Sequence, residues 1–207
     1  MLGALKHRGP RGARGLTMVE MMVVVAIAAV ILTLSAPSMR DFLARQRVAA
    51  VNAELVTDLQ FARSEAIARS REVYVTFRID HDALTCYTVH TLGTVGRCDC
   101  RRAIGSACDA LPEVQEIKTV QVPRSTSVTL QPPDAPANRI VFSKTQGLAA
   151  WEGHYASDPN YVADWADFPV GVESSRSGKL RTQVNIAGRP QVCSPGGSIR
   201  GAAACAP

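Results

Sequence analysis

The chain has 207 residues, and 46% of them are hydrophobic. Without its N-terminal segments, the remaining residues are enough for one globular domain of ordinary size. The chain's net charge of +5 is no argument for an anionic partner. Residues 1–15 hold four basic residues and no acid, so the remainder carries only 5 − 4 = +1. Only a local cluster of basic residues could recruit such a partner.

An apolar stretch runs from residue 16 to residue 35, and its only formal charge is Glu20. A helix of this length spans roughly 30 Å, the thickness of a bilayer's hydrocarbon core. A carboxylate there costs about 2.5–3.5 kcal/mol on insertion scales, so we expect Glu20 to be functional. Basic residues before the stretch keep the N-terminal end of the chain on the cytoplasmic side of the membrane. The residues after the stretch are then moved across the membrane. The basic residues are Lys6, Arg8, Arg11 and Arg14.

Three interpretations fit this stretch. A secretory signal peptide cleaved near Leu34-Ser35-Ala36 would rarely carry an acid in its apolar region, and a plain membrane anchor gives Glu20 no role. The third, which we favour, rests on the segment Gly15-Leu16-Thr17-Met18-Val19-Glu20. This segment resembles the class III signal of type IV pilins and type II secretion pseudopilins.

The resemblance implies cleavage after Gly15 and methylation of the new N-terminus at Leu16, where the family usually has Phe. Glu20 would then stand at the fifth mature position, where these proteins carry glutamate. Its charge would pair with the N-terminus of a neighbouring subunit and fix the stagger between helices, because an uncompensated buried charge is costly.

Beyond Pro37, where many pilins kink this helix, apolar residues recur at three- and four-residue steps, which predicts one buried helix face. This face holds Met39, Phe42, Leu43, Val48, Val51, Leu55, Leu59, Ala62 and Ala66. The opposite, polar face holds Arg40, Arg45, Arg47, Asn52, Asp58, Arg63 and Arg69. The predicted helix covers residues 16–71 and is about 84 Å long, so its first half must lie in lipid or against other subunits.

The rest of the chain predicts strands. Residues 73–79 and 84–90 form a hairpin over a turn at 80–83. Further strands are expected at 113–122, 127–131, 139–143, 170–174, 179–186 and 191–193. Residues 93–110 predict a loop joined by disulfides, and residues 144–168 a surface excursion.

Six cysteines lie beyond the apolar stretch, and an even number there fits disulfides in an oxidising compartment such as the periplasm. They are Cys86, Cys98, Cys100, Cys108, Cys193 and Cys205. Zinc is the alternative, since three of them lie near His90 in the sequence, but the two-residue gap of structural zinc sites is missing. We favour disulfides and no metal. The pairing stays open, with Cys193–Cys205 favoured first.

The C-terminal part contains segments 177–181, 184–189 and 192–197, which resemble the end of FimT/GspH-type minor pilins, and Glu65-Ala66 matches the helix exit of that group. The resemblance implies an α+β, type IV pilin-like fold: a long N-terminal α-helix with a transmembrane first half, packed on antiparallel β-sheets. The implied organisation is a cleaved leader (1–15), a transmembrane and filament-core helix (16–37), its continuation (38–71) and a periplasmic β-rich domain (72–207).

The implied function is that of a minor pilin subunit of a type IV pilus, anchored by a single pass in the bacterial inner membrane before it joins the filament. The alternative is a minor pseudopilin of a type II secretion system, acting in protein export. Expected partners are the prepilin peptidase/N-methyltransferase, other pilin or pseudopilin subunits and the inner membrane.

DNA is a further candidate partner, because some FimT-type pilins capture it for uptake through a Gly-Arg-x-Arg motif. This chain reads Gly188-Arg189-Pro190-Gln191 and lacks the second arginine. The candidate phosphate contacts are Lys179, Arg181, Arg189 and Arg200, and a solvated basic rim is the slightly favoured alternative. We expect no enzyme and no cofactor, since the four histidines form no triad or metal-ligand spacing.

Overall fold

The structure is a computed structural model that describes residues 17–79, 83–91, 98–132, 138–151, 168–175 and 178–205. The cleavage junction predicted at Gly15-Leu16 therefore lies outside the described residues. The chain forms two compact units, Met1–Arg40 and Asp41–Pro207.

Helix α1 runs from Met18 to Arg69. At its start the backbone N–H of Glu20 donates to Thr17 Oγ1 over 3.2 Å, a side-chain cap, and the Glu20 carboxylate lies in the first turn, where the helix dipole favours an acid. At its end Ser70 has a left-handed φ of 51°, and Arg71 N–H donates to the Ala66 carbonyl. The helix is slightly shorter at each end than the predicted 16–71.

In the first unit, the apolar side chains of α1 that the structure describes are exposed, Met18, Val19 and Leu32 most of all. No single helix among the described residues is long and apolar enough to cross a membrane. By length and composition, Met18–Thr33 and Ser38–Arg69 pass that test only when taken together as a bent pair.

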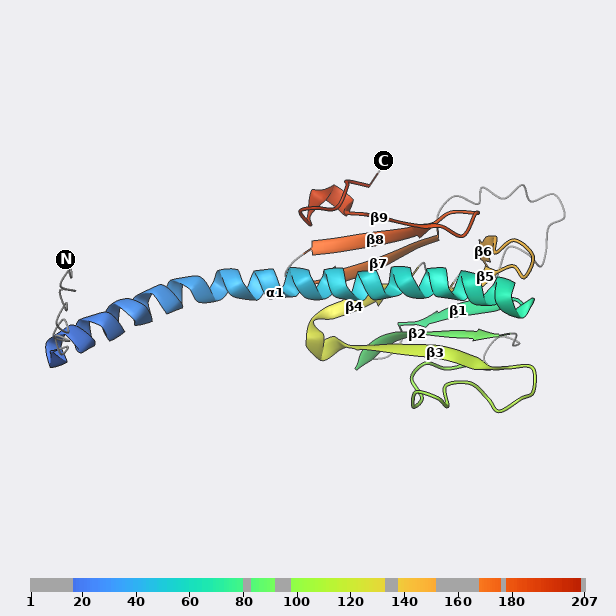
Figure 1. Cartoon of the computed structure of the whole chain (residues 1–207), viewed down its shortest axis with the longest axis horizontal. Coiled ribbons are helices and arrows are strands. Elements are labelled where there is room, and N and C mark those ends of the chain that lie inside the picture. Colours follow the sequence, from blue (N-terminus) through green and yellow to red (C-terminus); the bar gives the residue numbers. More distant parts are fainter. Residues whose placement is uncertain are drawn as a thin grey trace, which may run out of the picture. The chain divides into compact units, whose positions relative to one another are not determined.

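The second unit contains two antiparallel sheets (Figure 1). The five-stranded sheet has the order β3-β2-β1-β5-β6, and the four-stranded sheet the order β4-β7-β8-β9. The strands of the first are β1 (Val73–Arg78), β2 (Leu84–Thr91), β3 (Glu116–Pro123), β5 (Arg139–Phe142) and β6 (Ala149–Trp151). Those of the second are β4 (Val128–Gln131), β7 (Phe168–Ser174), β8 (Gly178–Val184) and β9 (Pro190–Cys193). Short 3-10 turns lie at Arg124–Thr126 and Pro195–Gly197.

The core lies between the two sheets and the C-terminal part of α1, which runs alongside both in Figure 1. Leu55 and Leu59 of the helix are fully buried in one cluster with side chains of both sheets, among them Phe77 and Val172. This confirms the predicted helix face from Val48 to Ala66. This part of α1 therefore gains most of its stability from packing rather than from intrinsic propensity.

Three details of the second unit differ from the sequence prediction. Asn52 and Asp58, placed on the polar outer face, are only 3% and 4% exposed. Phe42 and Leu43, predicted to lie on the buried face, are 50% and 46% exposed, and burial of this face begins at Ala44. Strand β6 was not predicted, since its sequence Ala-Ala-Trp carries no alternation.

Candidate functional site

Glu20 is the only acid in the apolar part of α1, and its side chain is exposed. Its apolar neighbours Val19, Val23 and Val24 are all at least half exposed. Within the described residues no cation forms an ion pair with the Glu20 carboxylate. This segment thus presents an apolar surface with one unpaired negative charge, which suits burial against a partner that brings a positive charge.

A buried acid joins α1 to the five-stranded sheet. The Asp58 carboxylate accepts hydrogen bonds from Tyr87 Oη and from Lys118 Nζ, each over 2.7 Å. Lys118 also reaches Glu54, one turn earlier, over 3.2 Å. Burial, together with the nearby Asp58 carboxylate, raises the pKa of the Tyr87 hydroxyl, which keeps it a hydrogen-bond donor.

A second buried polar side chain joins α1 to the other sheet. The Asn52 Oδ1 atom accepts a hydrogen bond of 2.8 Å from Thr182 Oγ1 on β8. Because Asn52 and Asp58 bond to different sheets, the rotation of this part of α1 about its own axis is fixed. The outward face of the helix is therefore set by the packed domain.

His90 on β2 lies in a buried polar network away from α1. Its Nδ1 atom is 3.0 Å from the Thr91 carbonyl, which can only accept, so Nδ1 carries the proton. Its Nε2 atom then accepts from Thr76 Oγ1 over 2.9 Å, and Arg139 Nε donates to the same hydroxyl over 3.1 Å. Burial lowers the pKa of His90 from 6.5 to about 4, so the imidazole is neutral.

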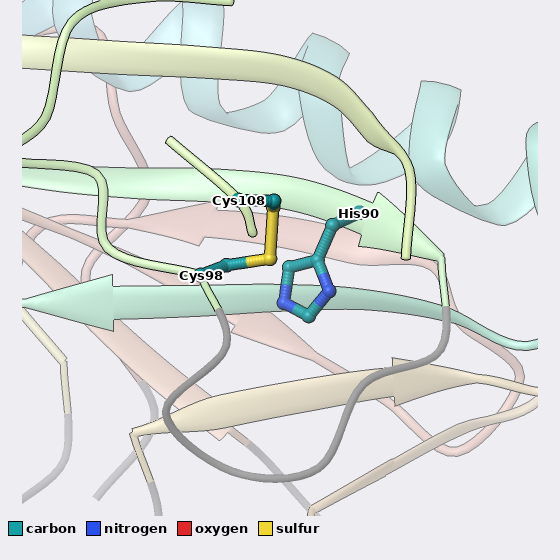
Figure 2. Close-up of side chains that lie close together, drawn as sticks. All are labelled: His90, Cys98 and Cys108. Atoms are coloured by element: carbon teal, nitrogen blue, oxygen red, sulfur yellow. A yellow bond between two sulfur atoms is a disulfide. The ribbon is translucent and has the colours of Figure 1, made fainter. Parts of the chain in front are cut away.

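The six cysteines form three disulfides, Cys86–Cys100, Cys98–Cys108 and Cys193–Cys205. The last is the pair that the sequence favoured. Cys98 and Cys108 face each other in an isolated antiparallel bridge, and their sulfurs lie beside the imidazole of His90 (Figure 2). As disulfides the cysteines offer no thiolate to a metal ion.

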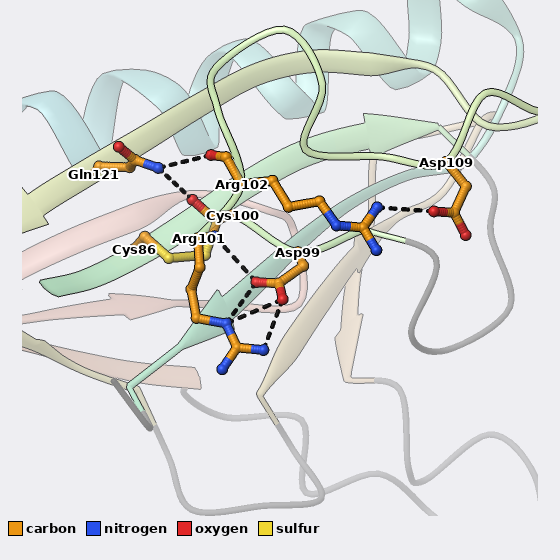
Figure 3. A network of polar contacts seen from close by, with 7 residues as sticks. All are labelled: Cys86, Asp99, Cys100, Arg101, Arg102, Asp109 and Gln121. Carbon is orange, nitrogen blue, oxygen red and sulfur yellow. Dashed lines mark hydrogen bonds and ion pairs between the residues drawn. A yellow bond between two sulfur atoms is a disulfide. The ribbon is translucent and has the colours of Figure 1, made fainter. Parts of the chain in front are cut away.

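The loop from Cys98 to Leu111 holds its own charges in internal pairs (Figure 3). Arg101 binds Asp99 through two nitrogens, and these hydrogen bonds lower the pKa of Asp99 to about 2. Arg102 Nη1 donates to Asp109 over 2.8 Å. Gln121 Nε2 on β3 donates to the carbonyls of Cys100 and Arg102 and ties the loop to the sheet.

The four basic residues proposed for DNA do not form one patch. Lys179, near the start of β8, has its charge compensated by Glu173 at 3.3 Å and donates to Gln131. Arg181 follows two residues later and is half-buried. Arg200 is exposed, and it follows Ile199, whose side chain lies beside Gly178 at the start of β8. Arg189 lies past the other end of β8, roughly 16 Å along the strand from Lys179.

Arg189 instead lies near a residue of α1 that the sequence did not single out. Arg63, Arg189 and Gly188 line a hollow of about 500 Å³ together with Gln60, Ser64, Ile67 and Pro190. Arg63 Nε donates to the Gly147 carbonyl over 3.1 Å. Gly188 has a φ of 69°, and a Cβ there would lie 2.5 Å from the same carbonyl, so this position requires glycine. Only the tertiary fold brings Arg63 and Arg189 together.

Two family models match the chain. The model described as type II transport protein GspH matches residues 52–188, and the prokaryotic N-terminal methylation motif matches residues 10–36. The chain belongs to the GspH family. No curated protein and no solved structure matches the chain significantly.

Membership of the GspH family, together with the methylation motif, identifies a pilin-like subunit, a minor pilin or pseudopilin with a prepilin signal. The methylation motif contains Gly15, Leu16 and Glu20. The GspH region begins at Asn52, ends at Gly188, and includes the end of α1 from Asn52 to Arg69 and all strands up to β8. Arg189, Arg200 and the Cys193–Cys205 loop lie beyond it.

Proposed function

We propose that the protein is a minor pseudopilin of a type II secretion system, assembled through α1 into a filament that acts in protein export. The observation that carries the proposal is the combination of a prepilin methylation motif with the GspH region in one chain. The description of that family favours the secretion system over the type IV pilus that the sequence resemblance put first.

In this proposal the prepilin peptidase cleaves after Gly15 and methylates Leu16, which leaves a positively charged amine at the start of the mature chain. The apolar segment then anchors the subunit in the inner membrane by a single pass, with the second unit in the periplasm. Its exposed apolar side chains, Met22, Val25 and Ile31 among them, become buried against other subunits when the filament forms.

Glu20 sets the register of this assembly. In a lipid or protein interior its carboxylate is costly unless a positive charge lies beside it. The N-terminal amine of a neighbouring subunit supplies that charge at only one stagger of the two helices. The role assigned to the chain is structural, so the enzyme in this pathway is the peptidase, a partner, and the chain itself needs no cofactor.

DNA capture as a type IV pilus subunit is a second candidate, and one observation favours it. Among the described residues, Arg63 and Arg189 line a common hollow and neither forms an ion pair. Two guanidinium groups there could each contact a phosphate. Lys179 contributes less, because Glu173 already compensates its charge.

Deleting the gene in its source bacterium and measuring two activities side by side tests both candidates. For a pseudopilin, secreted enzymes should accumulate in the periplasm while DNA uptake stays normal, and a plasmid copy should restore export. Normal export with lost DNA uptake would overturn the pseudopilin assignment and support the second candidate. A plasmid copy carrying Arg189→Ala then separates the two candidate functions further. For a pseudopilin this copy should restore export fully, because Arg189 belongs to the candidate DNA site only.

A further inference from the structure

His90, Cys98 and Cys108 place three good ligands for a thiophilic metal ion at one point. Their ligand atoms, the imidazole nitrogen and the two sulfurs, all lie within 4.8 Å of one another. Figure 2 shows the ring of His90 beside the disulfide. Two thiolates and one imidazole form a ligand set that suits zinc or Cu(I). While the disulfide is intact, neither sulfur is a thiolate.

We propose that the Cys98–Cys108 disulfide conceals a redox-controlled metal site, in which reduction frees two thiolates that bind Zn²⁺ together with His90. This site is separate from the filament function proposed above. It requires a dithiol reductant to open it and leaves the fourth zinc position to water.

One of the two hydrogen bonds of His90 already suits a metal ligand. The Nδ1–H group donates to the Thr91 carbonyl, which fixes the ring and leaves the lone pair on Nε2. That lone pair now accepts from the hydroxyl of Thr76. A metal ion about 2.0 Å from Nε2 would take the place of the Thr76 oxygen, so the Thr76 side chain must first turn about χ1 and give up its hydrogen bond from Arg139 Nε.

The loop should keep its place when the disulfide opens, because other interactions hold it on both sides. A second disulfide, Cys86–Cys100, fixes the loop to β2. The Glu116 carboxylate accepts from the backbone N–H groups of Gly105 and Ala107, and Asp99 N–H donates to the Ala107 carbonyl. The freed sulfurs can then separate to the spacing of about 3.7 Å that two thiolates take on tetrahedral zinc.

Burial makes the reduction selective within this part of the chain. Cys86 and Cys100 are 0% and 2% exposed, whereas Cys108 is half-buried and reachable. A donor thiolate attacks Cys108 Sγ, and Cys98 leaves as thiolate. The donor's second thiolate then closes its own disulfide and releases Cys108. Two electrons pass from the dithiol to the cysteines, and Zn²⁺ binding to the two thiols releases two protons.

The disulfide Cys193–Cys205 also joins a buried cysteine to a partly exposed one, so it provides the control. Its loop is of similar length, 12 residues against 10, but among the described residues no histidine completes a metal-ligand group with it. The test therefore uses the full mature chain in detergent micelles with Cys193→Ser and Cys205→Ser. In this background Cys98–Cys108 is the only accessible disulfide among the described cysteines.

The protein is reduced with dithiothreitol, freed of reductant under argon and titrated with Co²⁺ and then Zn²⁺. We expect two free thiols, one zinc per chain, thiolate-to-cobalt charge-transfer absorption, and no zinc binding before reduction. His90→Gln should weaken zinc binding at least tenfold with the thiol count unchanged. Thr88→Ala, two residues away on the same strand, should leave it unchanged.

Zinc affinity that is equal in the His90→Gln chain, or equal before and after reduction, would overturn the proposal. A reduced chain that carries two thiols, keeps its β-sheet circular dichroism and binds no zinc would overturn it as well. So would a reduced chain that loses this spectrum and does not recover it with zinc, because the site depends on the folded loop.

Discussion

His90 is neutral because burial disfavours its charged form, with its pKa lowered from 6.5 to about 4. As the pH falls, the unfolded chain therefore takes up this proton before the folded chain does. The stability contributed by the neutral ring is complete above about pH 6.5 and is lost as the pH falls towards 4. A shift of this size corresponds to about 3 kcal/mol at most.

Urea denaturation of residues 41–207 at pH 7 and at pH 4.5 should reveal this linkage. The wild-type domain should lose roughly 2–3 kcal/mol more of its free energy of unfolding between the two pH values than the His90→Gln variant does. Carboxylates titrate in both proteins, so the difference isolates the histidine. An equal loss in the two proteins would show that the ring is not held neutral.

Asp58 and Glu54 form a matched pair on α1, because both contact Lys118 while their burial differs. The side chain of Asp58 is 6% exposed and that of Glu54 is 47% exposed. Asp58→Asn keeps an acceptor for Tyr87 but removes the charge beside Lys118, and we expect a loss of about 2–3 kcal/mol. Glu54→Gln should change the free energy of unfolding by less than about 0.5 kcal/mol. Similar costs in denaturant melts would mean that burial does not decide the strength of these pairs.

Helix α1 also shows which features of the fold could be predicted from sequence patterns and which could not. The spacing from Val48 to Ala66 predicted the buried face correctly, because apolar periodicity reports a local geometry. The pattern placed Asn52 and Asp58 outside, because periodicity treats every polar residue as solvated. Their partners, Thr182 and Tyr87, are 130 and 29 residues away, and only the folded chain brings them close.

In the second unit, the positions of all strands but β6 could be predicted to within a few residues, and so could the hairpin pairs β1–β2 and β7–β8, but the pairings between strands distant in the sequence could not. Strand β1 pairs with β5 across a long excursion, and β4 leaves the sheet of β3 to pair with β7. The neighbours of the basic residues could not be predicted either, since Arg189 lies near Arg63 rather than near Lys179. The cysteine loop was recognised from composition, but the position of His90 beside Cys98–Cys108 depends on the sheet.

For the mature subunit, the residue that should govern assembly is Glu20. Glu20→Gln keeps the size and removes the charge, so insertion of the apolar segment into the membrane should become easier. Cleavage should also survive, because the peptidase reads mainly the residues around Gly15-Leu16. Filament incorporation should fail, because the buried amine of the neighbouring subunit would lose its partner.

The measurement compares the subunit's content in sheared filaments with its content in the membrane, for wild type, Glu20→Gln and Asp41→Asn. The last variant removes an exposed acid from the same helix outside the apolar stretch, and it should assemble normally. Mass analysis that finds Leu16 at the N-terminus of all three proteins separates assembly from processing. A subunit at the filament tip has no neighbour above it, so its own amine lacks this partner, but its Glu20 still meets the subunit that follows. Normal recovery of Glu20→Gln in the filament fraction would therefore exclude a registering role for this carboxylate at any position in the filament.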